Sequence, residues 1–485
     1  MYIGIDLGTS GVKTIVTDER GQVIESASAP LSVSMPKPLW SEQAPEDWWQ
    51  ATCKTLDHLA SKMPLESVKA IGLAGQMHGA TLLNSQGKVL RPAILWNDGR
   101  SEKQCTEIEK TVKSARKITG NIVMPGFTAP KLLWVKDNEP DIYKQIAKVL
   151  LPKDYLRFKL SGEYASDMSD SAGTSWLDVG KRSWSKSMLM ACGLNESHMP
   201  KLYEGNEVTG YLHNSLAEKW GMKSVAIVAG AGDNAAGAIG CGIVEPGQAM
   251  LSLGTSGVYF AVTNEFRSKP DSAVHSFCHA MPDRWHLMSV TLSAASCLDW
   301  YARNAGYQDV ASLINNVVNN TRVDDPYIPF FLPYLTGERT PHNNPNAKAG
   351  FFGITASTTR AQMAQAVIQG VSMALADGID VVHDSGVSVD GISLIGGGAK
   401  SVYWRQLLAN VSGIAMDYRE GGDVGPALGA ARLAQVAVNP LTPISDICPV
   451  PKKVGAYEPD PTLQDYFRHR RQKFRELYFS LESHF

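Results

Sequence analysis

Cysteine is scarce and scattered in this sequence. The seven cysteines are odd in number and never occur in CxxC spacing. A disulfide framework or a structural zinc site needs paired or clustered cysteines, so neither is indicated. We interpret the cysteines as small buried hydrophobic residues.

The chain also lacks a charge excess and a long apolar run. Its formal net charge is -2 at pH 7, so the composition gives no sign of binding to nucleic acid. The sequence contains no uninterrupted apolar stretch of about 18 residues, the length that predicts a membrane span. The N-terminus begins with a strand pattern instead of a leader. We expect a cytoplasmic protein with no membrane partner.

The length and apolar content indicate a large globular protein. A chain of 485 residues with 44% hydrophobic residues is too long for one core, so two domains, or three with an insertion, are expected. We place the boundary where the composition becomes mixed, giving domains 1–224 and 225–485.

A hexapeptide repeat organises the chain. The sequence LGTSGV occurs at Leu7–Val12 and again at Leu253–Val258, one copy in each half. Apolar runs on both sides of each copy predict a β-hairpin. Its turn glycines leave amides uncovered and its hydroxyls lie beside them, so two facing copies could hold a polyphosphate. An ordinary β-turn remains the alternative for either copy alone. The turn residues are Gly8, Thr9, Ser10, Gly11, Gly254, Thr255, Ser256 and Gly257.

The first hairpin carries two charged residues that the second lacks. Asp6 interrupts an apolar strand, either as a cap for the turn or as a Mg²⁺ ligand beside phosphate. Ser252 is its counterpart in the second copy. Lys13 follows the turn and either reaches a phosphate or is simply exposed.

Polar residues follow two further predicted strands. Val68–Leu73 delivers Met77 and His78 at its end, where ligands bind in α/β sheets, although His78 alone is also typical of a turn. The strand before Trp96 delivers an aromatic ring followed by Asn97, Asp98 and Arg100. These residues would suit a polyhydroxylated ligand, or they form a polar surface turn anchored by the tryptophan.

Residues 225–240 are the second centre of interest. A buried strand breaks into Gly230–Gly232, then Asp233 and Asn234, and then a small-residue helix. Asp233 either caps that helix or acts as a general base on a sugar hydroxyl, since partial burial would raise its basicity.

Weaker signals lie elsewhere. Gly396, Gly397 and Gly398 follow a strand and precede a helix, so their turn is a candidate nucleotide site. We interpret the acids of 167–173 as helix caps rather than a substrate rim. Arg339, His342 and Asn343 are either ligands or part of a surface loop. We also expect a long amphipathic helix over 358–384, a small-residue helix over 423–431 and a charged helical tail over 460–485.

These motifs together resemble the FGGY family of carbohydrate kinases, within the superfamily of sugar kinases, Hsp70 and actin. The resemblance covers nearly the whole chain: the duplicated LGTSG, GDN at 232–234, GGGAKS at 396–401, FTAPKLLW at 127–134 and GFFGI at 350–354. GQMHGA, ILWNDGR and DVGPALGAA are most similar to the branch that acts on D-xylulose. Glycerol-specific members have an Arg-Glu segment in place of Met77 and His78.

The resemblance implies roles for particular residues. Substrate positions fall on Met77, His78, Trp96, Asp233 and Asn234. Nucleotide positions fall on Gly8, Thr9, Ser10, Lys13, Gly254, Thr255, Gly396, Gly397 and Gly398. Asp6 and Asp233 would lie near the metal.

The implied fold is α/β, with two actin-like (ribonuclease H-like) domains, mixed central sheets flanked by helices, and a ligand cleft between them. The implied reaction is phosphorylation of D-xylulose at its 5-hydroxyl by ATP and Mg²⁺, with Asp233 as the general base and a homodimer as a possible assembly. A family member specific for another ketose or polyol, a nucleotide switch and a sugar-binding protein with a degenerate nucleotide site remain alternatives.

Overall fold

The structure is a computed structural model that describes residues 1–419 and 425–485. Each half of the chain builds one mixed sheet. The first sheet has the order β13-β14-β5-β1-β2-β3, with β15 beside β5. Its strands are β1 (Tyr2–Leu7), β2 (Gly11–Thr17), β3 (Val23–Pro30), β5 (Ala70–Gly75), β13 (Val208–Tyr211), β14 (Ala226–Val228) and β15 (Ala231–Gly232).

The second sheet repeats the pairing scheme of the first. Its order is β18-β19-β17-β16-β22-β23-β24. In each sheet an antiparallel hairpin, β1–β2 or β16–β17, pairs in parallel with a later strand, β5 or β22. The strands of the second sheet are β16 (Gln248–Leu253), β17 (Gly257–Thr263), β18 (His275–Cys278), β19 (Trp285–Thr291), β22 (Gly391–Ile395), β23 (Met416–Arg419) and β24 (Lys453–Tyr457). The hexapeptide repeat therefore reflects a duplicated half-molecule.

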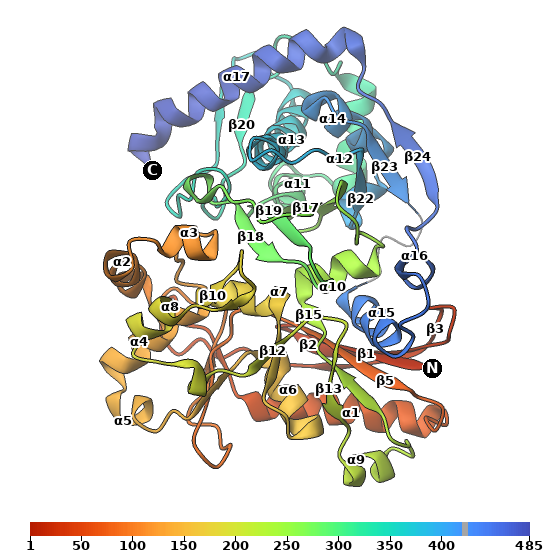
Figure 1. The fold of residues 1–485 in the computed structure, drawn as a ribbon. Helices are drawn as coiled ribbons and strands as arrows, with labels where there is room; N and C mark the ends of the chain where they lie inside the picture. Colours follow the sequence, from red (N-terminus) through yellow and green to blue (C-terminus); the bar gives the residue numbers. More distant parts are fainter. Residues whose placement is uncertain (420–424) are drawn as a thin grey trace.

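Helices flank both sheets (Figure 1). In the first half the helices are α1 (Pro45–Lys62), α2 (Glu102–Thr111), α3 (Ala115–Thr119), α4 (Thr128–Asn138), α5 (Pro140–Tyr143), α6 (Pro152–Ser161), α7 (Met168–Ser171), α8 (Lys186–Ala191) and α9 (Asn214–Lys219). After β15 come α10 (Asp233–Gly240), α11 (Ala295–Asn304), α12 (Val310–Asn320), α13 (Arg360–His383), α14 (Val402–Ser412), α15 (Pro426–Val438), α16 (Ile444–Ile447) and α17 (Gln464–Leu481). Helix α17 confirms the predicted helical tail.

Helix α15 lies on the sheet of the opposite half of the chain (Figure 1). A Cβ atom on Gly4 of β1 or on Gly72 of β5 would lie 1.9 Å from a carbonyl oxygen of this helix. Only glycine therefore allows so close an approach. The expected small-residue helix over 423–431 is present from Pro426, whereas Asp423 and Val424 lie outside the described residues.

The domain division at 224/225 stays a prediction, and two observations bear on it. Strands β14 and β15 follow that point yet belong to the first sheet. Helix α15 also packs on the first sheet. The chain therefore passes between the two halves of the molecule more than once.

Helix α13 differs from the expected amphipathic helix. Side chains on all its faces are buried between Ala364 and Ile379, because strands β19 and β20 (Phe330–Leu332) and helices α11, α12 and α14 surround it. Among the described residues it is the one helix long and apolar enough to cross a membrane, but 83% of that window is buried inside the protein. It is thus the central core helix of the second half.

Candidate active site

The two identical turns fold differently. In the first hairpin Leu7 pairs with Val12, and the Gly8 amide donates to the Gly11 carbonyl at 2.9 Å. In the second hairpin Leu253 pairs with Gly257, and the Gly254 amide donates to Ser256 at 3.1 Å. The second turn is therefore one residue tighter.

The ends of three parallel strands bring two carboxylates together. Asp6 of β1 and Ala231 of β15 both pair with Ala74 of β5. Asp233 follows two residues after Ala231, at the start of α10. Both predicted acids therefore lie at the same edge of the first sheet, where α/β sheets bind ligands.

Asp233 has one occupied and one available oxygen. Its Oδ1 accepts hydrogen bonds from the Asn234 backbone amide at 2.7 Å and from Asn234 Nδ2 at 2.9 Å. The described residues offer no hydrogen bond to Oδ2. Burial raises the pKa of Asp233 to about 6, against the opposing effect of the two hydrogen bonds. A partly buried carboxylate of this basicity is well matched to proton abstraction near neutral pH.

Asp6 shares the local field of Asp233. Burial and the nearby Asp233 raise the pKa of Asp6 to about 7, and Lys13, which pairs with Asp6 across the hairpin, acts in the opposite direction. Two carboxylates that resist ionisation together would be stabilised by a cation. Among the described residues no group of three or more His, Cys, Asp or Glu side chains is arranged so that it could hold a metal ion by itself.

Met77 lies beside the residue that precedes Asp233, and His78 follows Met77 in the chain. A Cβ atom on Gly232 would stand 2.9 Å from Met77 Sδ, so the thioether covers the residue before the candidate base. His78 adopts a left-handed backbone, with φ of 69°, and its ring stacks on Phe127 at 4.7 Å.

The tautomer of His78 follows from its partner. Its Nδ1 lies 2.7 Å from the Gly173 carbonyl oxygen, which only accepts, so Nδ1 carries the proton. Burial lowers the pKa of His78 to about 3. The neutral ring therefore leaves Nε2 as an acceptor for a ligand hydroxyl.

Trp96 is tied to the first turn. Its Nε1 donates to Thr9 Oγ1 at 2.9 Å, and that hydroxyl donates to Gln76 Oε1 at 3.2 Å. Gln76 Nε2 in turn donates to Gln43 Oε1. With 42% of its surface exposed, Trp96 retains a free ring face beside the turn.

Asp98 and Arg100 do not form a ligand rim. The two side chains bond each other at 2.7 Å, and Arg100 also bonds Glu42 and lies 3.6 Å from the ring centroid of Trp40. Asp98 is 2% exposed. Neither the ligand rim nor a polar surface turn describes Asp98 and Arg100, because both side chains are buried and their charges are already satisfied within the protein.

The second hairpin and the glycine turn meet at one cavity. It has a volume of about 890 Å³ and is lined by Gly254, Thr255, Gly397, Gly398 and apolar residues of α11 and α12. Gly396 has φ of 87°, and a Cβ atom there would lie 2.9 Å from the Leu253 carbonyl oxygen. Glycine is therefore required for the turn to close against the hairpin.

The remaining candidate residues lie in different surroundings. His342 stacks on Tyr478 of α17 at 3.5 Å and is a packing residue. Arg339 and Asn343 line a separate cavity of about 550 Å³ with Met124 and Gly126. Asp167 caps α7 through the amides of Ser169 and Asp170, which confirms the cap interpretation for that acid.

Several site residues were not singled out from the sequence. Gln76 and Gln43 hold Thr9, and Phe127 supports His78. Lys131 is fully buried and donates to the His78 carbonyl oxygen at 3.0 Å. Gln76, Phe127 and Lys131 lie within the GQMHGA and FTAPKLLW segments, so the motifs marked the segments without assigning these side chains.

The repeated sheet and hairpin give the molecule an actin-like two-domain α/β fold. The chain belongs to the FGGY family of carbohydrate kinases. The N-terminal domain of that family matches residues 1–240 and its C-terminal domain matches residues 249–438. This confirms the predicted family, the two-domain α/β fold and ATP-dependent carbohydrate kinase activity.

Two relatives that align with almost the whole chain are xylulose kinases. The chain is 59% identical over 481 residues to the xylulose kinase of Escherichia coli (strain K12) and 55% identical over 483 residues to that of Klebsiella pneumoniae, covering 99% of each chain. It superposes on the crystal structure of a "xyloylose kinase" from Brucella ovis with a TM-score of 0.95 and 46% identity, covering 99% of both chains.

Proposed function

We propose that this protein transfers the γ-phosphoryl group of ATP to the terminal 5-hydroxyl of D-xylulose, giving D-xylulose 5-phosphate in xylose metabolism. The observation that carries this substrate is the 59% identity to a xylulose kinase along almost the entire chain. The side chains expected to face the sugar are Met77, His78, Trp96, Asp233 and Asn234.

The reaction follows from the available oxygen of Asp233. Asp233 Oδ2 accepts the proton of the 5-hydroxyl while the oxygen of that hydroxyl attacks the γ-phosphorus in line, and ADP leaves. Asn234 fixes the carboxylate through Oδ1, while His78 Nε2 accepts a hydrogen bond from another hydroxyl of the ketose. Fixed orientation of base and acceptor supplies much of the acceleration.

The nucleotide is proposed to span the two hairpins. The 890 Å³ cavity beside Gly397, Gly398 and Thr255 has the size and apolar lining of a nucleoside pocket. The phosphates would then extend past Gly254 toward Gly8, Thr9 and Ser10, with Lys13 on the outgoing strand available to a phosphate oxygen.

We expect Mg²⁺ to bind at Asp6 and Asp233. These residues would supply two carboxylates, which suits an ion that keeps several waters and binds substrate phosphates. When bound, the ion would neutralise charge on the phosphates. The rise in the pKa of Asp6, caused by burial and by the nearby Asp233, supports this proposal. A cytoplasmic location and a homodimer remain predictions.

A single coupled assay of ADP release tests the substrate and the base. With MgATP, D-xylulose should give kcat/KM about tenfold or more above D-ribulose, L-ribulose, L-rhamnulose, gluconate and glycerol, which is about 1.4 kcal/mol of discrimination. Asp233→Asn should still bind D-xylulose while kcat falls about 10²- to 10⁴-fold.

The matched control is Asp141→Asn, whose side chain is 92% exposed on the surface and which should behave as wild type. Preference for another sugar would overturn the substrate, and wild-type turnover by Asp233→Asn would overturn the base.

A further inference from the structure

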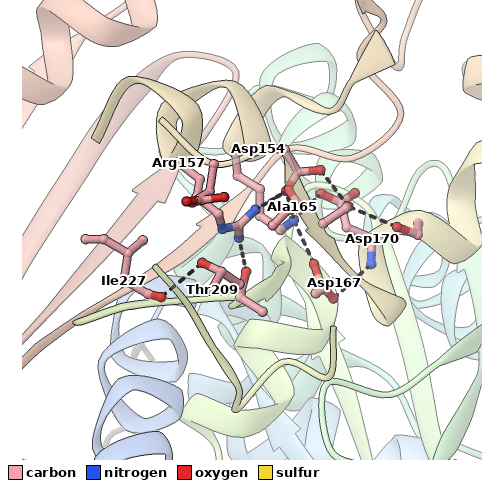
Figure 2. Close-up of polar contacts among 12 residues, drawn as sticks. Asp154, Arg157, Ala165, Asp167, Asp170, Thr209 and Ile227 are labelled. Atoms are coloured by element: carbon pink, nitrogen blue, oxygen red, sulfur yellow. Dashed lines mark hydrogen bonds and ion pairs between the residues drawn. The ribbon is translucent and has the colours of Figure 1, made fainter. Parts of the chain in front are cut away.

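Five charged side chains form a fully buried cluster next to the segment that precedes Asp233. Figure 2 labels four of them, Asp154, Arg157, Asp167 and Asp170. Lys153 Nζ contacts Asp154 at 2.7 Å, Asp167 at 2.7 Å and Asp170 at 3.1 Å. Arg157 contacts Asp154 at 2.6 Å. Each of the five side chains has 0% exposure.

The three carboxyl groups of the cluster differ in environment. Burial raises the pKa of Asp170 well above its usual range, although the nearby Lys153 acts against this. Burial acts in the same direction on Asp154, but the adjacent Lys153 and Arg157 hold its pKa below the usual value. The two cations are thus surrounded by three carboxyl groups, one of which resists ionisation.

Stabilisation of the fold does not by itself explain a buried cluster of charged side chains. Burial of an ion costs several kcal/mol even after relaxation, and well-packed apolar residues often stabilise a core as much as a buried ion pair does. What the ionic arrangement adds is a fixed geometry, since every partner is bound in a defined direction.

The cluster holds the turn before Asp233 at two points. Arg157 donates to the carbonyl oxygens of Ala165 and Ala229. Ser169 donates its hydroxyl proton to Asp167 and accepts a hydrogen bond from the Gly232 amide at 3.1 Å. The chain from Ala229 to Gly232 is therefore fixed at both ends immediately before the proposed base.

The segment that carries Ser169 also contacts a residue on the proposed sugar side. Gly173, which follows α7, accepts the hydrogen bond from His78 Nδ1. Lys153 additionally packs its Cβ against Gly75 of β5, the residue paired with Gly232. One buried cation thus supports both the helix that carries Ser169 and the strand beside Gly232.

We propose that Lys153, Asp167 and Ser169 are positioning residues that set the place of the base carboxylate in phosphoryl transfer. They touch neither sugar nor nucleotide and act through the Gly232 amide. This inference rests on the proposed role of Asp233 as the base.

The test compares two serines of the same short helix. Ser169→Ala removes the acceptor of the Gly232 amide, whereas Ser171→Ala removes a hydroxyl that is equally buried and bonds only Ser166. Because small displacements of a reacting group are costly, Ser169→Ala should lower kcat roughly 10- to 100-fold with KM for D-xylulose within about threefold. Ser171→Ala should keep kcat within about twofold.

Equal kcat in the two folded variants would overturn the inference. If Ser169→Ala does not fold, Ser169→Cys replaces it, because the thiol is a weaker acceptor of similar shape. An intermediate kcat supports positioning, and a wild-type kcat overturns it.

A double variant separates this inference from the proposed function. In the Asp233→Asn background, Ser169→Ala should produce no further loss of the residual turnover, because both changes act on one group. A full additional loss would overturn positioning through Asp233. Failure of the base assignment itself would show as wild-type turnover in the single Asp233→Asn variant.

Discussion

The two LGTSGV hairpins have the same letters and different structures. In the first, Asp6 lies opposite Lys13, and Thr9 is bonded to Trp96 and Gln76. In the second, Ser252 lies opposite Val258, and the Thr255 carbonyl oxygen accepts from Ala294 and Ser296 at the start of α11. One turn is linked to the proposed sugar side and the other to the proposed nucleoside cavity.

The two hairpins have different surroundings. A Cβ atom on Gly11 would lie 2.8 Å from the Ala29 carbonyl of the neighbouring strand, whereas one on Gly257 would lie 2.3 Å from Leu375 Cδ2 of α13. The corresponding glycines therefore meet a fixed backbone oxygen in one hairpin and the movable end of a side chain in the other. Local sequence sets a strand, a turn and a strand, and tertiary contacts select the pairing.

The largest expected contrast lies in the carboxylate that only the first hairpin has. Asp6→Asn should lower kcat about 10- to 100-fold at limiting Mg²⁺, with partial recovery at high Mg²⁺, since a ligand contact is weakened. The equivalent change in the other hairpin, Ser252→Ala, should leave kcat near the wild-type value. Steady-state kinetics at several Mg²⁺ concentrations would measure both, and equal losses would erase the distinction between the hairpins.

The pH dependence should also originate on the side of the first hairpin. With the pKa of Asp6 raised to about 7 and that of Asp233 to about 6, each carboxyl gains a proton as the pH falls through its value. Protonation removes a base or a cation ligand, so kcat/KM should fall about tenfold per pH unit between pH 7 and pH 6 and approach about 100-fold per unit below pH 6, where both carboxyls gain a proton.

A profile of kcat/KM from pH 5 to pH 8 is the measurement, and Asp6→Asn should lose the upper of the two ionisations. A flat profile through this range would show that neither carboxylate must be ionised.

The smallest expected effects are those of the two threonine substitutions. Thr9→Ala frees Trp96 and should raise KM for D-xylulose about 3- to 10-fold, the worth of one or two hydrogen bonds, in addition to any effect on KM for ATP through the phosphates. Thr255→Ala, at the proposed nucleoside cavity, should raise KM for ATP and leave KM for D-xylulose near the wild-type value. Initial rates with each substrate varied in turn would measure both, and an unchanged KM for D-xylulose in Thr9→Ala would contradict the difference between the turns.

Sequence reasoning found the segments of the site and missed their internal support. The strand ends that carry Met77, His78 and Asp233 were predictable, because ligands bind at such ends and the motifs resemble a known family. Asp98 and Arg100 looked equally suited to a ligand, yet they bond each other and Glu42. A polar side chain in a linear pattern does not show whether the protein has already satisfied it.

The sequence alone determined the duplication, the family and the residues at which chemistry is proposed, since all of these depend on local patterns repeated or resembled. Tertiary structure alone decided the different registers of the identical turns, the return of α15 to the first sheet and the buried Lys153 cluster next to the segment that precedes Asp233. The physical reason is that burial, hydrogen-bond partners and close backbone approach are set by segments distant in the chain, which no local pattern specifies.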